Sequence, residues 1–140
     1  MARAAKYQIE CRVGRLIETR LEWLNTASDL NLVEEALIRA FGQAGASAVI
    51  CSDWRGIEVF SPEVGEALIE LLRRDNVRIE RSALLLSPGG AIFNLQVERL
   101  LREAGNPARR AFRNVDHLLA WLGEVLSPEE TQSARQWFGG

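Results

Sequence analysis

Short apolar runs alternate along this chain with longer segments of helical periodicity, and this alternation restricts the fold more than any other feature. Residues 48–51 and 83–86 are unbroken apolar runs, typical of strands that are covered on both faces. Apolar residues at helical spacing follow each run, beginning at Val64 and at Phe93. Strands that alternate with helices predict an α/β fold with a mostly parallel sheet and right-handed crossovers.

The chain opens with a different pattern, in which two alternating segments are joined by a two-residue turn. Residues 7–13 and 17–23 each place apolar side chains on one side and charged side chains on the other. Gly14 and Arg15 lie between them, and glycine in the first turn position suits a type II′ turn. These segments predict an antiparallel hairpin at the sheet edge, with one face open to water.

Capping residues mark where the helices begin and end. Ser61 and Pro62 suit the N-cap and the first position of a helix. Gly105 follows the last apolar residue of another helical segment, where glycine commonly ends helices. Ser127 and Glu130 have the spacing of a capping box. The predicted order of elements is ββαβαβαβα, followed by a short tail helix.

The length and composition describe one domain of ordinary globular type. At 140 residues we expect a single domain over residues 1–140, with a core of about 7–126 and a tail helix of about 127–138. The net charge of -2 predicts no binding to nucleic acid, and the lack of a long apolar run predicts no membrane insertion. Cys11 and Cys51 lie in strand-like runs, and no secretory signal opens the chain, so we expect a cytoplasmic protein.

Three stretches, taken in order, resemble the STAS domains of bacterial anti-sigma-factor antagonists, and most closely the STAS/SEC14-like branch. They are the opening hairpin with its helix, the strand, loop and helix of residues 48–64, and residues 109–122. The resemblance implies a STAS-like fold and a non-catalytic regulatory module that binds a signalling protein. In that family a serine at the start of the second helix is phosphorylated. Counted from Asp53, Pro62 takes that place, so we expect the usual phosphorylatable serine to be missing.

The loop after the central strand is the predicted partner-binding site. Asp53, Trp54 and Arg55 follow the strand directly, and Ser61 and Glu63 begin the next helix. Ligands and partners of open α/β sheets meet the carboxyl ends of the strands. Tryptophan and arginine contribute much of the binding energy at protein interfaces. The alternative is a solvated loop with Trp54 folded down as a lid on the core.

A second candidate is the glycine-containing turn at Ser87, Gly89 and Gly90, which joins a strand to the start of a helix. Backbone N–H groups at such a position can bind an anion, for example a phosphate or a lipid headgroup. The turn lacks the residues of a P-loop and of the dinucleotide fingerprint. The alternative is a plain turn without a ligand.

A third candidate is a group of arginines around the last predicted strand. Arg109, Arg110 and Arg113 are positioned to form a docking face for an acidic partner. The alternative is a solvated surface whose charge is balanced by Glu98 and Glu103.

The sequence predicts no catalytic residue, no metal site and no cofactor. His117 is the only histidine, and with two separated cysteines it provides too few ligands for a zinc site. Asp53 resembles the phospho-accepting aspartate of receiver domains, but the acidic pair and the lysine of that chemistry are missing. An uncharacterised hydrolase using Glu58 and Glu63 is the remaining enzyme alternative.

Two non-catalytic alternatives stay open. The SEC14-like resemblance implies a carrier that binds a small ligand, a lipid or a nucleotide, between the sheet and the helices. A homo-oligomer is the other, formed through the hairpin edge or through Trp137 and Phe138 in the tail. Those two aromatic residues either pack on the chain's own core or form an exposed apolar patch.

Overall fold

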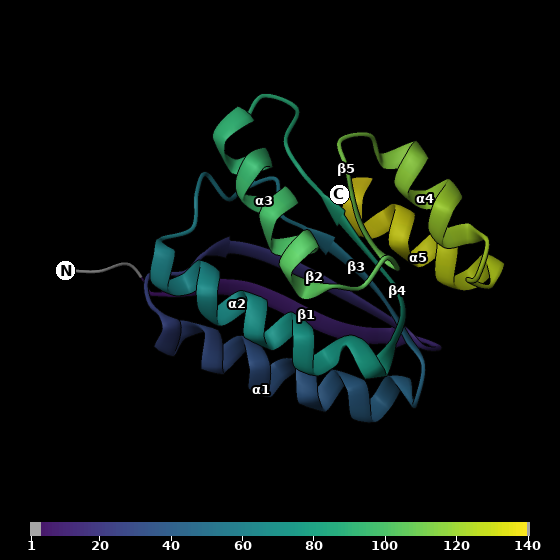
Figure 1. Ribbon diagram of the computed structural model, residues 1–140. Coiled ribbons are helices and arrows are strands. Elements are labelled where there is room, and N and C mark those ends of the chain that lie inside the picture. Colours follow the sequence, from purple (N-terminus) through teal and green to yellow (C-terminus); the bar gives the residue numbers. More distant parts are fainter. Residues whose placement is uncertain (1–3, 140) are drawn as a thin grey trace.

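The computed structural model describes residues 4–139 and shows an α/β fold built on a five-stranded mixed sheet (Figure 1). The strands are β1 (Lys6–Val13), β2 (Leu16–Trp23), β3 (Ala48–Asp53), β4 (Ile79–Leu85) and β5 (Arg109–Phe112). The helices are α1 (Ala27–Ala44), α2 (Pro62–Asp75), the 3-10 turn η1 (Asn76–Arg78), α3 (Ala91–Ala104), α4 (Val115–Gly123) and α5 (Pro128–Gly139). None of the helices within residues 4–139 combines the length and the apolar character that crossing a membrane requires.

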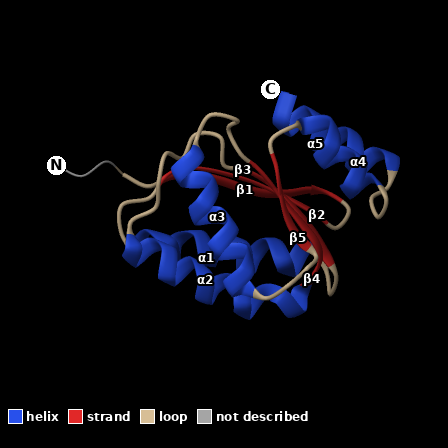
Figure 2. Cartoon of the chain, turned by 45° about the horizontal axis from the view of Figure 1, so that its top comes forward, coloured by secondary structure: helices blue, strands red, loops and turns tan. Residues whose placement is uncertain are grey.

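The strands lie in the sheet in their order along the chain, from β1 at one edge to β5 at the other. β1 and β2 are antiparallel, and all other neighbouring strands are parallel. Helices α1, α2 and α3 make the three crossovers and cover one face, while α4 and α5 cover the other (Figure 2). The predicted mostly parallel sheet with an antiparallel hairpin is therefore confirmed.

The opening hairpin has the two-residue turn that the sequence predicts. Val13 pairs with Leu16, so Gly14 and Arg15 form the turn. Gly14 has a φ of 57°, and Arg15 has a negative φ, which is the pattern of a type II′ turn. The Arg15 N–H donates to the carboxylate Oε2 of Glu130 at 2.9 Å, which ties the turn to the start of α5.

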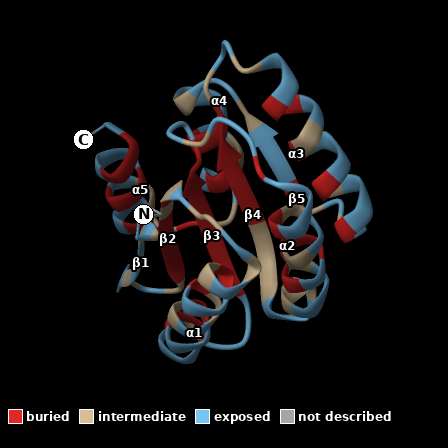
Figure 3. Ribbon diagram, turned by 90° about the vertical axis from the view of Figure 1, so that its left-hand side faces the viewer, coloured by how far each residue is buried: buried red, intermediate tan, exposed pale blue. Residues whose placement is uncertain are grey.

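Two apolar cores lie on opposite faces of the sheet because successive side chains of a strand point to opposite sides (Figure 3). Ile50 faces the core under α1, α2 and α3. Its neighbours Val49 and Cys51 face the core under α4 and α5. All six residues of β3 are buried, as expected for a central strand.

The expected solvent-exposed face of the hairpin is found on β1, where Gln8, Glu10 and Arg12 are exposed, but it is wrong for β2, which α5 covers. Glu18 of β2 is fully buried, and its carboxylate accepts hydrogen bonds from Arg12 at 2.9 Å and from the Ser133 hydroxyl at 2.9 Å. A buried carboxylate requires such partners. The charged side of the alternating pattern therefore marks a polar contact with the tail helix.

The tail helix is part of the fold. Ser127 and Glu130 form the predicted capping box, with the Glu130 N–H donating to Ser127 Oγ at 3.1 Å and the Ser127 N–H donating to Glu130 Oε1 at 2.8 Å. Trp137 and Phe138 are buried in the second core. Of the two alternatives for these aromatic residues, packing on the chain's own core is the one observed.

Candidate functional site

The carboxyl ends of β2, β3 and β4 meet at one edge of the sheet because these strands are parallel. The loop from Asp53 to Ser61 and the turn before α3 lie at this edge, which we call the carboxyl edge. The geometry gives each predicted site residue a definite place: Asp53, Trp54 and Arg109 are buried, and most of the others are exposed.

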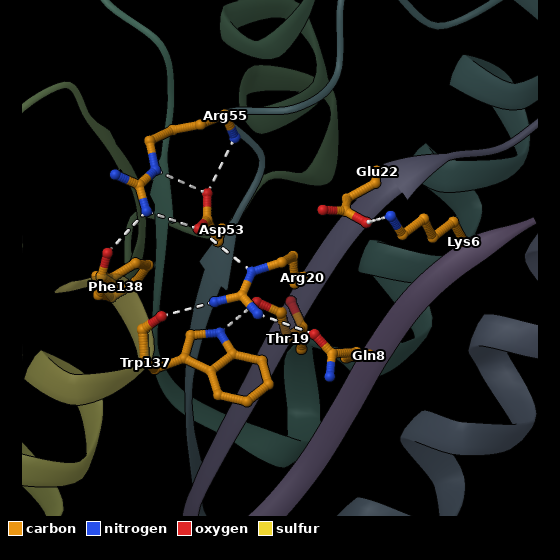
Figure 4. A network of polar contacts seen from close by, with 9 residues as sticks. All are labelled: Lys6, Gln8, Thr19, Arg20, Glu22, Asp53, Arg55, Trp137 and Phe138. Carbon is orange, nitrogen blue, oxygen red and sulfur yellow. Dashed lines mark hydrogen bonds and ion pairs between the residues drawn. The ribbon is translucent and has the colours of Figure 1, made fainter. Parts of the chain in front are cut away.

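Asp53 is buried at the end of β3 and is held by two arginines (Figure 4). Arg55 Nε donates to Asp53 Oδ1 at 3.0 Å and Arg55 Nη2 donates to Oδ2 at 2.8 Å, while the Arg55 N–H donates to Oδ1 at 3.1 Å. Arg20 of β2 approaches Oδ2 at 3.5 Å. We call Asp53, Arg20 and Arg55 the Asp53 clamp.

The clamp shifts the pKa of Asp53 and that of Arg55. Burial raises the pKa of Asp53, but the hydrogen bonds from Arg55 and the charges of Arg55 and Arg20 outweigh burial and lower that pKa below its ordinary value. The hydrogen bond to Asp53 raises the pKa of Arg55. Asp53 and Arg55 therefore stay ionised at neutral pH.

The clamp binds the last turn of α5. Arg20 Nη2 donates to the Trp137 carbonyl at 2.6 Å, and Arg55 Nη2 donates to the Phe138 carbonyl at 2.9 Å (Figure 4). These carbonyls lack partners within their own helix, and the negative end of the helix dipole favours cations there. The Trp137 indole lies under Arg20, with the guanidinium 4.6 Å from the ring centroid. Asp53 and Arg55 thus hold the tail helix in place.

Trp54 lies in the core and not on the surface, since only 4% of it is exposed. Its ring packs edge-to-face on Phe60, with the centroids 5.5 Å apart, and also contacts Phe93 of α3. Its indole Nε1 is buried without a hydrogen-bond partner in the described chain. The alternative in which Trp54 closes the core is therefore the one observed.

The remaining two predicted partner-binding residues stabilise helix starts. The Ser61 hydroxyl accepts from the Val64 N–H at 3.2 Å, so Ser61 is the N-cap of α2. The Glu63 carboxylate accepts from the Ala27 N–H at 3.3 Å and links the starts of α2 and α1. Both residues are exposed at the carboxyl edge.

Exposed apolar side chains lie on the loop between β3 and α2 and on the first turns of α3. Gln96 of α3 fixes the loop by exchanging two hydrogen bonds with the Phe60 backbone, at 3.0 and 2.9 Å. Val59 precedes Phe60 and is 57% exposed. Ile92 lies one helical turn before Gln96 and is 71% exposed, and Leu95 beside it is 65% exposed.

We call Val59, Ile92 and Leu95 the edge patch. The sequence contains a signal for it: Ile92 and Leu95 are apolar but lie outside the helical stripe that faces the core. Beside the patch, Ile57 and Val59 line a surface hollow of about 560 Å³, which Trp23 at the end of β2 also lines. The carboxyl edge thus presents apolar side chains on α3 and on a loop that the Gln96 hydrogen bonds fix to α3.

The other two predicted sites lie elsewhere. Ser87 and Gly90 are partly buried and Gly89 is exposed, and this turn leads into α3 without a side-chain cap. Arg109 is buried, donates to Asn76 Oδ1 at 2.8 Å and to the Leu72 carbonyl at 3.1 Å, and ties β5 to the end of α2.

The three predicted docking arginines therefore differ in their exposure to water. Burial lowers the pKa of Arg109 to about 10, so it is still charged at neutral pH, but it offers no surface charge. Arg110 and Arg113 are exposed, and the Arg110 guanidinium lies 4.9 Å from the centroid of Trp121.

A small cavity lies between the sheet and helices α1 and α2. It has a volume of about 50 Å³, and its lining includes the hydroxyl residues Thr19, Ser52 and Ser82. One water molecule needs about 10–15 Å³ of such space, so the cavity has room for a few waters. At this size it gives no support to a lipid ligand, because an acyl chain would require α1 and α2 to move away from the sheet.

The residues considered for catalysis lie apart or have structural contacts. His117 is exposed, and its backbone N–H donates to Asn114 Oδ1 at the start of α4. Glu63 caps α1 as described, and Glu58 is exposed in the loop. Within residues 4–139 no group of three or more His, Cys, Asp and Glu side chains is placed to hold a metal ion.

No protein-family model matches the chain, and a search of the curated proteins likewise finds no match.

Proposed function

We propose that this chain is a non-catalytic regulatory module that binds a signalling protein through its carboxyl edge. The observation that supports this most is the edge patch. Val59, Ile92 and Leu95 are large apolar side chains that face water on two segments, which the hydrogen bonds between Gln96 and the Phe60 backbone join. Exposed apolar groups gathered in this way are typical of protein interaction sites.

The support beneath the patch favours binding as well. The Asp53 clamp, the aromatic packing of Trp54 on Phe60, and the Gln96 hydrogen bonds fix the loop before any partner arrives. A surface that is already ordered loses less conformational entropy on binding. The predicted site residues thus act in this proposal as the supports of the interface, and the contacts come from their exposed neighbours.

The resemblance to STAS domains leads to the same proposal, because anti-sigma-factor antagonists act by binding regulatory proteins. The proposal does not require a phosphorylated serine. Pro62 takes the place of that residue in the register counted from Asp53, and the hydroxyl of Ser61 serves as the N-cap of α2.

The test compares three forms of the tagged chain in pull-downs from the cells in which the chain is made. The patch variant carries Val59→Glu and Ile92→Glu. The control variant carries Leu32→Glu and Ile38→Glu on α1. Leu32 and Ile38 are also exposed apolar residues, 45% and 52% exposed. Quantitative mass spectrometry then identifies the proteins that the wild type retains.

We expect a partner that the wild type and the control variant retain and the patch variant loses. Circular dichroism and the urea midpoint check that both variants are folded. A partner that the patch variant retains equally well would refute the assignment of the carboxyl edge. Loss of the partner in both variants would show that the change acts through charge alone.

A further inference from the structure

A second groove lies on the opposite side of α3, between that helix and β5. Its lining includes Leu86, Val97 and Leu101, and it has a volume of about 360 Å³. β5 is the last strand of the sheet, so one of its edges has no neighbouring strand within residues 4–139. We propose that this groove, the β5 groove, binds an extended acidic segment of another protein, which adds to the sheet as a strand beside β5.

The backbone of β5 has groups along its outer edge that find no partner among residues 4–139. The carbonyls of Ala108 and Phe112 accept from the N–H groups of Ser82 and Leu86 in and after β4, at 2.9 and 2.8 Å. Backbone groups of alternate residues in a strand point to opposite sides. The N–H and carbonyl of Ala111 therefore point away from β4, and Ala111 is exposed. An extended peptide can pair with such groups as an added strand.

The charges at this edge select an acidic partner. Arg110 and Arg113 are both exposed, and neither forms an ion pair with another residue in the range 4–139. Glu98 is the one carboxylate in the lining of the groove. A second copy of the chain paired through β5 would bring arginines opposite arginines, which is unfavourable in a strand pair. Charge complementarity thus favours a segment rich in Asp or Glu.

Asn94 indicates where the segment enters the groove. It lines the groove, is only 7% exposed, and its Oδ1 has no hydrogen-bond partner in the described chain. A buried acceptor without a donor is unfavourable. A hydroxyl or amide side chain of the bound segment supplies that donor. Leu101 follows Asn94 two helical turns further along α3, is partly buried and provides apolar surface in the same groove.

The probe is a synthetic peptide, Glu-Val-Glu-Thr-Glu-Val-Glu, with both ends blocked, titrated into the ¹⁵N-labelled chain. In an extended conformation its four glutamates lie on one side, and its two valines with the threonine between them lie on the other. We expect the backbone amide signals of Ala111 and Arg113 to shift and their hydrogen exchange to slow. A peptide with lysine in place of glutamate should bind at least about 10-fold more weakly.

Three variants test the separate parts of the proposal. Ala111→Pro removes one outward N–H and leaves the hydrogen bonds to β4 in place, because proline is tolerated at sheet edges. Arg110→Glu with Arg113→Glu reverses the charge. Each should weaken the peptide about 10-fold or more. Asn94→Leu should weaken the peptide while it leaves the chain at least as stable, since the unpartnered acceptor is gone. Arg39→Glu on α1, also an exposed arginine, is the matched control and should bind like the wild type.

Three outcomes would overturn the proposal: no amide shift at residues 109–113 with about 2 mM peptide, equal binding of the lysine peptide, or unchanged binding by Ala111→Pro. Shifts limited to arginine side chains would identify a general anion site and would also refute strand pairing. The β5 groove is independent of the edge patch. The Val59→Glu and Ile92→Glu variant should therefore bind the peptide normally, so failure of either proposal is recognised separately.

Discussion

Replacing Asp53 by asparagine should loosen the tail helix by a predictable amount. The Asp53 carboxylate accepts three hydrogen bonds from Arg55. The side-chain amide of the asparagine variant keeps only one acceptor oxygen and directs its NH₂ group toward the Arg55 guanidinium. A hydrogen bond to a charged group contributes about 1.5–3 kcal/mol. Because the Arg55 side chain is 42% exposed, we take the lower part of that range, about 2 kcal/mol of unfolding free energy. In a chain of 140 residues this lowers Tm by about 6 °C.

The pH dependence of the free energy of unfolding separates the loss of the Asp53 charge from a change in packing. The folded state lowers the pKa of Asp53, so its ionised form stabilises the fold at every pH above the ordinary aspartate value of about 4. That stabilisation is lost as the pH falls through the folded-state pKa. The difference between wild type and Asp53→Asn should therefore stay constant from about pH 7 to pH 5 and shrink below about pH 4.

Urea unfolding followed by tryptophan fluorescence measures both effects. The control is Glu66→Gln, which removes a shorter ion pair, 2.6 Å from Arg99, between side chains that are 62% and 55% exposed. Surface pairs of this kind contribute little, so the control should change the free energy of unfolding by less than about 0.5 kcal/mol. Equal losses in Asp53→Asn and Glu66→Gln, or a loss that does not depend on pH, would refute the reasoning about the clamp.

Three further results are expected. Phe138→Ala should cost about 3–5 kcal/mol in urea unfolding, since it empties a buried site in the second core. Gly14→Ala should cost about 2 kcal/mol by the same assay, because alanine at a φ of 57° is strained and its Cβ would overlap the Glu130 carboxylate. Burial raises the pKa of Cys51 well above its ordinary value, so at pH 8 a thiol reagent should modify Cys11 in the native chain and should reach Cys51 only after unfolding.

The local elements were predictable because their signals are local. The unbroken apolar run of β3, the Pro62 start of α2 and the Ser127 capping box each depend on a few neighbouring residues. The parallel order of the strands follows from the alternation of strands and helices. The fold class could therefore be derived from the sequence without any relative of the chain.

The site was less predictable because its contacts join distant segments. Glu18 is buried only because Ser133, 115 residues later, provides a hydroxyl beside it. Asp53 and Arg55 are close in sequence, but the carbonyl of Phe138 that they help to bind comes from the tail. From the sequence alone Trp54 could face water or the core. Its contact with the aromatic ring of Phe93, a residue of another segment, places it in the core. Periodicity contains no information on such long-range polar contacts.

Hydrogen exchange on the chain alone and on the chain with its captured partner tests the central claim most directly. We predict slower exchange in residues 57–60 and 91–96, the segments that bear the edge patch, and unchanged exchange in α1. Protection that falls on α1 instead, or no change at the carboxyl edge while the partner is bound, would contradict it.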